Sequence, residues 1–443
     1  LKSHPNIIKQ AIRFNMEADS LNCIILGSDV TVEMEEFTIF IKEIVREMTA
    51  KAGQKCTAIR RTIVPEGMTQ SVIDALKQRL ETVRVGQPEA EGVRMGPLAG
   101  LDQVKEVRER VDELRQNAEL VFGEREEFEV VDADRNKGAF YEPTLLYCAE
   151  PLHTDSVHEI EAFGPVNTVM PYTDLDEAIQ LSAKGGGSLV GSVVTANDTI
   201  ARKLVLGIAP HHGRVLVLNR ESAPESTGHG SPMPTLVHGG PGRAGGGEEM
   251  GGVRGVLHYM QRTALQGSPT TLKNITGEWT RGAEQTLDKV HPFRKYFEEL
   301  EIGETLVTHR RTVTEADVVN FAALSGDWFY AHVDEVAVQE SPVFERRVAH
   351  GYFVLSAAAG LFVDPAPGPV LANYGLENLR FTQPVYIGDT IQAKLTCKTK
   401  APKAPREGEV LQGVVSWAVE VINQMDETVA VYTILTLVAQ KTD

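Results

Sequence analysis

The sequence has few cysteines, no excess of positive charge and no long apolar run. The four cysteines, Cys23, Cys56, Cys148 and Cys397, form no CxxC pair, which argues against a disulfide framework and a structural zinc site. Asp and Glu outnumber Lys and Arg by 61 to 44, giving a formal net charge of −17. Such a surface repels nucleic acid and anionic membranes, and no apolar run could span a bilayer. We therefore expect a cytoplasmic protein that binds neither nucleic acid nor membrane.

The chain begins with LKSHPNIIKQ, which has neither an initiator Met nor the apolar segment of a signal peptide. We therefore expect a fragment whose N-terminal portion is absent. A chain of 443 residues is too long for one compact core, so two or three domains are expected.

Residues from about 30 to 265 alternate helical and β-rich patterns. Residues 35–48 place apolar side chains at helical spacing. Short runs typical of buried strands lie at residues 58–64, 189–194 and 214–219. Strands that alternate with helices predict an α/β domain over residues 1–266. The polar stretch 267–290 breaks this rhythm, and we expect a linker there.

From residue 291 to 443 the pattern changes to α+β. Thr314 can cap a helix that has Asp317 at its third position, and Gly326 should end that helix. Residues 351–362 are so apolar that we expect a helix buried on every side. Long β-rich segments follow at 374–399, 411–422 and 428–440. A buried helix followed by long antiparallel strands is the pattern of a hot-dog fold.

The segment KAGQKCTA places Cys56 between a predicted helix and a predicted strand. A turn permitted by Gly53 could present the thiol beside free backbone amides, which would lower the pKa of the thiol and stabilise an oxyanion. Glu17, in the polar segment FNMEADSLN, could activate water once a thioester has formed on Cys56. Taken alone, a single cysteine is more often an inert small hydrophobe, and Glu17 more often a solvated surface charge.

Three motifs together favour the chemical interpretation. MEADSLN, GQKCTA and EAFGPV follow one another as they do in the aldehyde dehydrogenase superfamily, which residues 1–265 resemble. GRVLVLN and GGPGRAGGGEEMGG further resemble its closing strand and its glycine-rich C-terminal segment. The resemblance implies that Cys56 is the nucleophile, that Glu17 is the general base and that Glu161 contacts the ribose of a nicotinamide cofactor.

In that family most of the cofactor-binding domain precedes the glutamate motif, and the resemblance therefore implies that this part is absent here. We therefore expect the C-terminal half of a dehydrogenase domain with a partial cofactor domain, and a cofactor that is NADP, with NAD possible. Gly240, Gly242 and Gly245 spell the dinucleotide fingerprint GxGxxG, but glycine and proline surround them where a strand and a helix are required. We interpret this motif as a loop.

The segment SGDWFYAH carries a second candidate pair, Asp327 and His332. On a continuous helix they would lie about 140° apart, but a loop after Gly326 can bring them together as a general acid/base pair for water. A helix-capping Asp and a surface His are the plainer alternative. Gly351, at the start of the next helix, offers a backbone amide at the positive end of the helix dipole, where a thioester carbonyl would be polarised.

Asp327, His332 and the HGYFVLS segment resemble the MaoC-like branch of hot-dog hydratases over about residues 291–443. The two resemblances on one chain imply a bifunctional enzyme that hydrates a coenzyme A thioester and oxidises an aldehyde. They also imply a homo-oligomer, a hexamer, which nothing in the residues shows independently. Two alternatives stay open. One is a fused dehydrogenase and enoyl-CoA hydratase of an aromatic or fatty acid pathway. The other is an active hydratase whose dehydrogenase domain is a non-catalytic scaffold.

Overall fold

The structure is a computed structural model. It describes residues 1–12, 14–125, 128–233, 236, 238–247 and 252–441. The chain divides into two compact units, Leu1–Gln261 and Arg262–Asp443, and each is described by itself. Among the described residues, no helix combines the length and the apolar character that a membrane crossing requires.

A seven-stranded sheet with the order β4-β6-β7-β2-β1-β8-β9 forms the centre of the first unit. Its strands are β1 (Cys23–Leu26), β2 (Arg61–Pro65), β4 (Glu119–Phe122), β6 (Thr144–Tyr147), β7 (Val166–Tyr172), β8 (Ser188–Val194) and β9 (His212–Leu218). All neighbours pair in parallel except β4, which lies antiparallel to β6 at the edge. β1 and β8 are buried at every residue, as expected of parallel strands covered on both faces.

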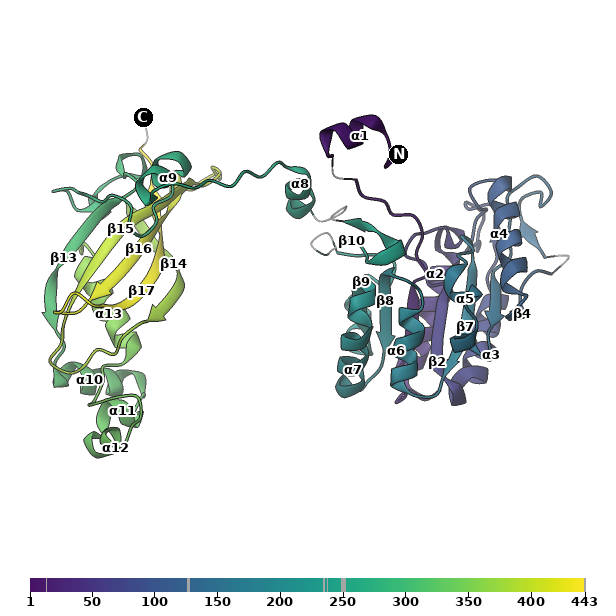
Figure 1. Cartoon of the computed structure of the whole chain (residues 1–443), viewed down its shortest axis with the longest axis horizontal. Coiled ribbons are helices and arrows are strands. Elements are labelled where there is room, and N and C mark those ends of the chain that lie inside the picture. Colours follow the sequence, from purple (N-terminus) through teal and green to yellow (C-terminus); the bar gives the residue numbers. More distant parts are fainter. Residues whose placement is uncertain (13, 126–127, 234–235, 237, 248–251, 442–443) are drawn as a thin grey trace. The chain divides into compact units, whose positions relative to one another are not determined.

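Helices cover both faces of this sheet (Figure 1). Ile24 and Leu26 of β1 share a core with α2 (Glu35–Thr49) and α3 (Thr69–Glu81). Cys23 and Ile25 point the other way, because successive residues of a strand face opposite sides, and pack in a core with residues of α6 and α7. The further elements of this unit are α1 (Pro5–Gln10), α4 (Leu101–Leu114), α5 (Ser156–Glu159), α6 (Leu175–Ala183), α7 (Asp198–Ile208), α8 (Val253–Tyr259), β3 (Val85–Gly86), β5 (Val130–Val131), β10 (His238–Gly239) and β11 (Gly246–Gly247). The predicted α/β pattern, including the helix from residue 35, is confirmed.

The second unit is a hot-dog fold, a sheet wrapped around one helix (Figure 1). Its sheet has the order β12-β13-β15-β16-β17-β14. The strands are β12 (Thr286–Leu287), β13 (Glu304–Thr312), β14 (Val370–Phe381), β15 (Thr390–Pro402), β16 (Gln412–Ile422) and β17 (Thr428–Ala439). α13 (Gly351–Phe362) packs Phe353, Val354, Ala357 and Phe362 into a core that includes Trp417 of β16. The predicted α+β class of this part is confirmed.

Short helices precede the central helix of this unit. They are α9 (Pro269–Thr276), α10 (Glu315–Ser325), α11 (Tyr330–Val333) and α12 (Glu335–Gln339). α10 begins as predicted: the Asp317 backbone N–H donates to the Thr314 hydroxyl oxygen (3.2 Å), and the Asp317 carboxylate accepts from the Thr314 N–H (2.9 Å). Gly326 ends this helix in the left-handed conformation with φ +76°, which only glycine adopts at no steric cost.

Two expectations for the second unit differ from the structure. Residues 267–290, expected as a linker, carry α9 and β12, and Trp279 is buried there with its backbone N–H donating to the Lys398 carbonyl (3.0 Å). The two units instead divide after Gln261. The expectation that residues 351–362 are buried on every side is wrong, because Tyr352 is 67% exposed. An apolar sequence pattern indicates that a helix has apolar faces. It does not show which of these faces are buried by other residues of the same chain.

Candidate active sites

The three residues predicted for the dehydrogenase-like unit lie at the amino ends of neighbouring parallel strands. Glu17 precedes β1, Cys56 precedes β2 and Glu161 precedes β7, and these strands are adjacent in the order β7-β2-β1. Their side chains line one cavity of about 560 Å³. Residues that are far apart in the chain are thus brought to one edge of the sheet.

A left-handed turn carries Cys56 out of the end of α2. Lys51, Ala52 and Gly53 all have positive φ, of 53°, 51° and 70°. Only glycine fits the last position, because an added Cβ at Gly53 would lie 2.2 Å from the carbonyl oxygen of Gly164. The close approach that the sequence suggested at Gly53 is therefore a contact with the segment that follows Glu161.

A buried guanidinium holds this turn against the Glu161 segment. Arg60, only 4% exposed, donates to the carbonyl oxygens of Gly53 (2.9 Å) and Gly164 (2.6 Å). Its Nε also donates to Glu161 Oε1 (3.3 Å), and the Ser20 backbone N–H donates to Glu161 Oε2 (3.3 Å). Burial raises the pKa of Glu161, against the attraction of Arg60. One cation thereby fixes the thiol turn and the carboxylate together.

The resting thiol of Cys56 is not acidic, contrary to the expectation from its sequence context. Burial, followed by the negative charge of Glu17, raises the pKa of Cys56 to about 12. The backbone N–H groups of Cys56 and Thr57 act in the opposite direction, as predicted, but they are outweighed. The turn follows the C-terminus of α2, whose dipole also disfavours a negative charge.

The sequence reasoning missed a histidine beside this pair. His238 of β10 places its Nε2 3.9 Å from Cys56 Sγ and 3.9 Å from Glu17 Oε2. It lies 182 residues after Cys56, directly before the glycines of the rejected fingerprint. Those glycines lie in and around a hairpin formed by β10 and β11, so their interpretation as a loop is confirmed. Residues 248–251 of the glycine-rich segment lie outside the described residues.

The cavity fits the nicotinamide–ribose end of a dinucleotide. Its lining includes the acidic residues Glu17, Asp19, Glu106, Glu159 and Glu161 and the basic residue Arg110. Carboxylates accept hydrogen bonds from ribose hydroxyls and stabilise the positive charge of an oxidised nicotinamide ring, whereas they repel phosphates. Glu161, partly buried beside the thiol turn, belongs to this lining.

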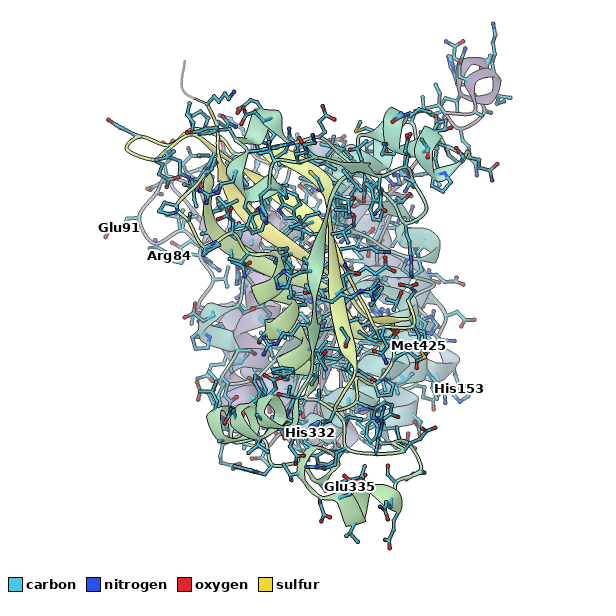
Figure 2. All side chains as sticks on the ribbon, turned by 90° about the vertical axis from the view of Figure 1, so that its left-hand side faces the viewer. Arg84, Glu91, His153, His332, Glu335 and Met425 are labelled. Carbon is cyan, nitrogen blue, oxygen red and sulfur yellow. The ribbon has the colours of Figure 1, made fainter. Side chains whose placement is uncertain are left out.

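The second predicted pair meets in the hot-dog unit. Because the chain reverses at Gly326, Asp327 Oδ2 lies 4.0 Å from His332 Nε2, where one water could bridge the two atoms. Figure 2 labels His332, which lies in α11, and Glu335, which begins α12. The Nδ1–H of His332 donates to the Val348 carbonyl (2.8 Å), which leaves Nε2 as the acceptor that faces Asp327. Burial lowers the pKa of His332, so the imidazole is neutral at pH 7.

His350 contacts both members of this pair. Its ring stacks on His332 with centroids 3.8 Å apart, and its Nε2–H donates to the backbone carbonyl of Asp327 (3.0 Å). His350 is 1% exposed, and its Nδ1 has no hydrogen-bond partner among the described residues. The HGYFVLS motif contains this histidine, but the sequence predicts a role only for the backbone amide of the following residue, Gly351.

Gly351 and His332 line the same cavity, which has a volume of about 350 Å³. Gly351 is the first residue of α13, and an added Cβ would lie 2.6 Å from the ring of Phe381. The N–H groups of a first helical turn have no partner within the helix and lie at its positive end. A carbonyl oxygen bound at this point of the cavity would therefore be polarised.

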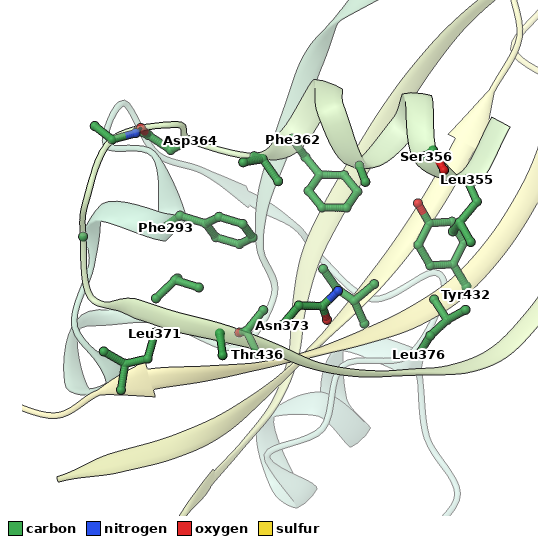
Figure 3. A pocket seen from close by; sticks show the side chains of 17 residues that line it. Phe293, Leu355, Ser356, Phe362, Asp364, Leu371, Asn373, Leu376, Tyr432 and Thr436 are labelled. Carbon is green, nitrogen blue, oxygen red and sulfur yellow. Dashed lines mark hydrogen bonds between the residues drawn. The ribbon is translucent and has the colours of Figure 1, made fainter. Parts of the chain in front are cut away.

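A further cavity of this unit, of about 390 Å³, lies between α13 and β14 (Figure 3). Its lining is mostly apolar and includes Phe293, Phe362 and Tyr432. Of the described residues, neither His332 nor Gly351 is part of that lining. This cavity is therefore separate from the candidate chemistry.

The two folds and their side-chain clusters define a chain that joins a thiol-bearing α/β unit to a hot-dog unit with an Asp–His pair. A family model described as aldehyde dehydrogenase family matches residues 6–265, and one described as MaoC like domain matches residues 298–418. Since the first covers more than half of the chain, the chain belongs to the aldehyde dehydrogenase family. The MaoC-like domain follows on the same chain.

Named relatives agree with this composition. The chain is 57% identical over 316 residues to Protein MaoC of Klebsiella aerogenes, covering 71% of this chain and 92% of that protein. It is 47% identical over 241 residues to 3,4-dehydroadipyl-CoA semialdehyde dehydrogenase of Aromatoleum evansii, covering 54% of this chain and 47% of that protein. The chain thus spans nearly all of the first relative and about half of the second.

Two solved structures are similar to parts of the chain. Apo betaine aldehyde dehydrogenase of Staphylococcus aureus is 22% identical with a TM-score of 0.49, covering 57% of this chain and 46% of that one. The monoamine oxidase regulatory protein of Archaeoglobus is 31% identical with a TM-score of 0.31, covering 36% of this chain and 99% of that one.

Proposed function

We propose that this chain belongs to a bifunctional ring-opening enzyme of bacterial phenylacetate degradation. The hot-dog domain adds water to oxepin-CoA and opens its ring, which yields a CoA-linked semialdehyde. The dehydrogenase domain then oxidises the aldehyde to a carboxylate, 3-oxo-5,6-dehydrosuberyl-CoA, with NADP as the cofactor and NAD as the alternative. The observation that carries this proposal is the convergence of Cys56, Glu17 and Glu161 on one cavity, in a chain that also holds the Asp327–His332 pair.

In the dehydrogenase step, Cys56 attacks the aldehyde carbon. The resulting oxyanion lies near the backbone N–H groups of Cys56 and Thr57, which interact with the sulfur. The nicotinamide cofactor, when bound, accepts the hydride, and Glu161 would hold its ribose. Glu17 then takes a proton from the water that hydrolyses the thioester. Arg60 holds the thiol turn and the Glu161 segment together during both half-reactions, because its guanidinium donates hydrogen bonds to both.

In the hydratase step, Asp327 and His332 hold and deprotonate the attacking water. His332 is neutral at pH 7 and its Nε2 faces Asp327, which suits a proton acceptor. The N–H of Gly351 polarises the thioester carbonyl, so that the developing enolate charge lies at the positive end of α13. The reactive aldehyde is then oxidised by the dehydrogenase domain of the same chain.

The experiment is an assay of the two steps in the intact protein with purified oxepin-CoA. Ring opening is followed by mass spectrometry of the CoA products, and oxidation by the absorbance of the reduced cofactor with NADP and NAD in parallel. We expect the CoA-linked carboxylate as the final product and faster turnover with NADP. Failure to consume oxepin-CoA, while another enoyl-CoA is hydrated, would refute the substrate and keep the reaction class.

A second candidate changes the substrate and keeps both reactions. The Aromatoleum evansii relative is named for a CoA-linked semialdehyde of six-carbon type, 3,4-dehydroadipyl-CoA semialdehyde. This favours a CoA-linked aldehyde as the substrate class and leaves room for a different aromatic or fatty acid pathway. Comparing kcat/KM for the two semialdehydes discriminates between these substrates. Cofactor reduction with either aldehyde would also exclude a dehydrogenase domain that is only a scaffold.

We also propose that the protein is a cytoplasmic homo-oligomer, a hexamer as the family resemblance implies. Exposed apolar side chains on α13 and β14 support association, since Tyr352, Leu371 and Tyr374 are 67%, 45% and 55% exposed. Light scattering coupled to size exclusion measures the mass, and a monomer at micromolar concentration would refute this proposal.

A further inference from the structure

His238 lies beside both the nucleophile and the general base of the dehydrogenase site, and the nearest polar atoms of Glu17, Cys56 and His238 all lie within 4.8 Å of one another. Its Nε2 is 3.9 Å from Cys56 Sγ and equally far from Glu17 Oε2, and its side chain is only 10% exposed. A histidine so buried against a thiol and a carboxylate is in reach of two reacting atoms. The imidazole can take a proton from one and interact with the other.

The backbone fixes His238 relative to Glu17. His238 lies on β10, which pairs with β11 in a hairpin with the register His238↔Gly247. The Gly246 N–H donates to the Met16 carbonyl (3.1 Å), directly before Glu17. Gly245 approaches the same carbonyl so closely that an added Cβ would lie 1.8 Å from its oxygen. The hairpin is therefore anchored on the segment that carries the base.

The surroundings of Cys56 explain why the thiol needs a proton acceptor. Among the described residues, Glu17 acts on the thiol through its charge and through a hydrogen bond, and the buried Arg60, which is itself paired with Glu161, is a further charged neighbour. Burial and Glu17 together oppose a free thiolate. A thiol in such surroundings attacks a carbonyl efficiently only if its proton leaves as the bond to carbon forms.

We propose that His238 is the proton acceptor of the Cys56 thiol, and that Glu17 is thereby kept ionised for the hydrolytic step. This inference rests on the proposed dehydrogenase function. As the S–C bond to the aldehyde forms, the S–H bond breaks and its proton moves to Nε2 of His238. The imidazolium that results lies beside the Glu17 carboxylate, whose charge stabilises it.

The proton returns in the second half-reaction. Water attacks the thioester while Glu17 takes a proton from it, and the S–C bond breaks as His238 gives its proton back to the Cys56 sulfur. Glu17 then releases its proton to solvent, and the carboxylate product leaves. The cycle consumes one aldehyde, one water and one oxidised nicotinamide cofactor. If Glu17 served both steps, it would have to lose the thiol proton before it could act on water.

The test is the pH dependence of Cys56 alkylation by iodoacetamide, followed by peptide mass spectrometry in the intact chain. The other cysteines, Cys23, Cys148 and Cys397, are buried and serve as internal references. His238→Gln keeps size and polarity but cannot accept a proton at neutral pH. We expect alkylation of Cys56 at pH 7 to slow by about a hundredfold, the lower end of the usual range for a general base, and the rise of the rate to move to higher pH.

Three further variants make the outcome decisive. His153→Gln replaces an exposed histidine of the same unit and should leave the alkylation profile unchanged. Glu17→Gln removes the negative charge that opposes the thiolate, so alkylation should accelerate rather than slow. His238→Phe is the second replacement at the site if His238→Gln lowers the melting temperature. An alkylation profile equal to that of the unmodified protein in a folded His238 variant would overturn the proposal.

The alkylation readout needs neither substrate nor cofactor, so it separates this inference from the proposed function. A slowed His238 variant in a protein that oxidises no CoA-linked aldehyde would keep the acceptor role and refute the substrate. An active dehydrogenase whose Cys56 alkylation profile is unchanged by substitution of His238 would refute the acceptor role and keep the proposed substrate. In an active protein, His238→Gln should reduce the initial burst of reduced cofactor, whereas Glu17→Gln should spare the burst and abolish steady turnover.

Discussion

Asp327→Asn separates chemistry from stability in the hot-dog unit. The substitution keeps the size of the side chain and removes its negative charge. Asp327 Oδ1 accepts from the Phe329 N–H (3.2 Å), a bond that the amide oxygen of Asn can also accept. The side chain is 44% exposed, so no buried charge is lost. We expect the free energy of unfolding to change by less than about 1 kcal/mol, within the range of a helix cap.

The rate should change far more than the stability. If Asp327 deprotonates the attacking water, hydration of an enoyl-CoA thioester should fall by about a hundredfold or more. That fall corresponds to roughly 2.7 kcal/mol of barrier, from about 1.36 kcal/mol per tenfold. His332→Ala should lose activity on a similar scale. The assay is the loss of enoyl-CoA absorbance in the intact protein, with the melting temperature measured for each variant.

A neighbouring aspartate supplies the matched control. Asp334 is exposed and caps α12, where its Oδ1 accepts from the N–H groups of Val336 and Ala337 (both 3.0 Å). Asp334→Asn makes the same chemical change outside the His332 pair and should keep the full hydration rate. Equal rates in Asp327→Asn and Asp334→Asn would refute the assignment of Asp327 as the base. A rate loss that only follows a lowered melting temperature would do so as well.

Three further outcomes are expected. Cys56→Ala should abolish aldehyde oxidation and leave ring hydration intact, so that the semialdehyde accumulates and is detected by mass spectrometry. Glu17→Gln should retain a burst of reduced cofactor but lose steady turnover. Unchanged steady turnover in either variant would contradict the roles of Cys56 and Glu17. A fragment 262–443 should unfold cooperatively in calorimetry, and fragment 291–443, which lacks α9 and β12, should melt at a lower temperature or fail to fold. Burial lowers the pKa of His158 from 6.5 to about 4, so its contribution to stability is present above pH 6.5 and is lost as pH falls toward 4, by up to about 3 kcal/mol. His158→Gln should flatten this dependence in urea unfolding between pH 7 and pH 5, and an unchanged slope would show that other groups cause it.

Local signals made much of the fold predictable. The apolar stripe of α2 and the cap formed by Thr314 and Asp317 involve residues a few positions apart, so the sequence displays them directly. Gly326 likewise ends α10 for a reason internal to the backbone. The polar stretch 267–290 differs because its structure depends on packing against a distant strand. Trp279 is ordered by the Lys398 carbonyl, which no local pattern reveals.

The sites follow the same division. Spacing and motif order suggested Cys56, Glu17 and Glu161, and the structure brings them to one cavity. The direction in which the pKa of Cys56 shifts could not be predicted, because the shift depends on how deeply the thiol is buried and how near Glu17 lies. His238 was missed for a related reason. A single histidine carries no signal until the hairpin, which is anchored on the Met16 carbonyl through Gly246, places it beside Glu17.

The position of Cys56 at the amino edge of the sheet has a consequence for its chemical durability. Reactive cysteines that oxidise readily are thiolates at neutral pH, commonly at helix N-termini or beside cations. Cys56 instead follows a helix C-terminus, lies beside a carboxylate and has a pKa of about 12. Its sulfur is therefore held as a thiol between turnovers, which makes it a poor target for peroxide. The Cys56 sulfur can thus stay reduced although the side chain is not completely buried.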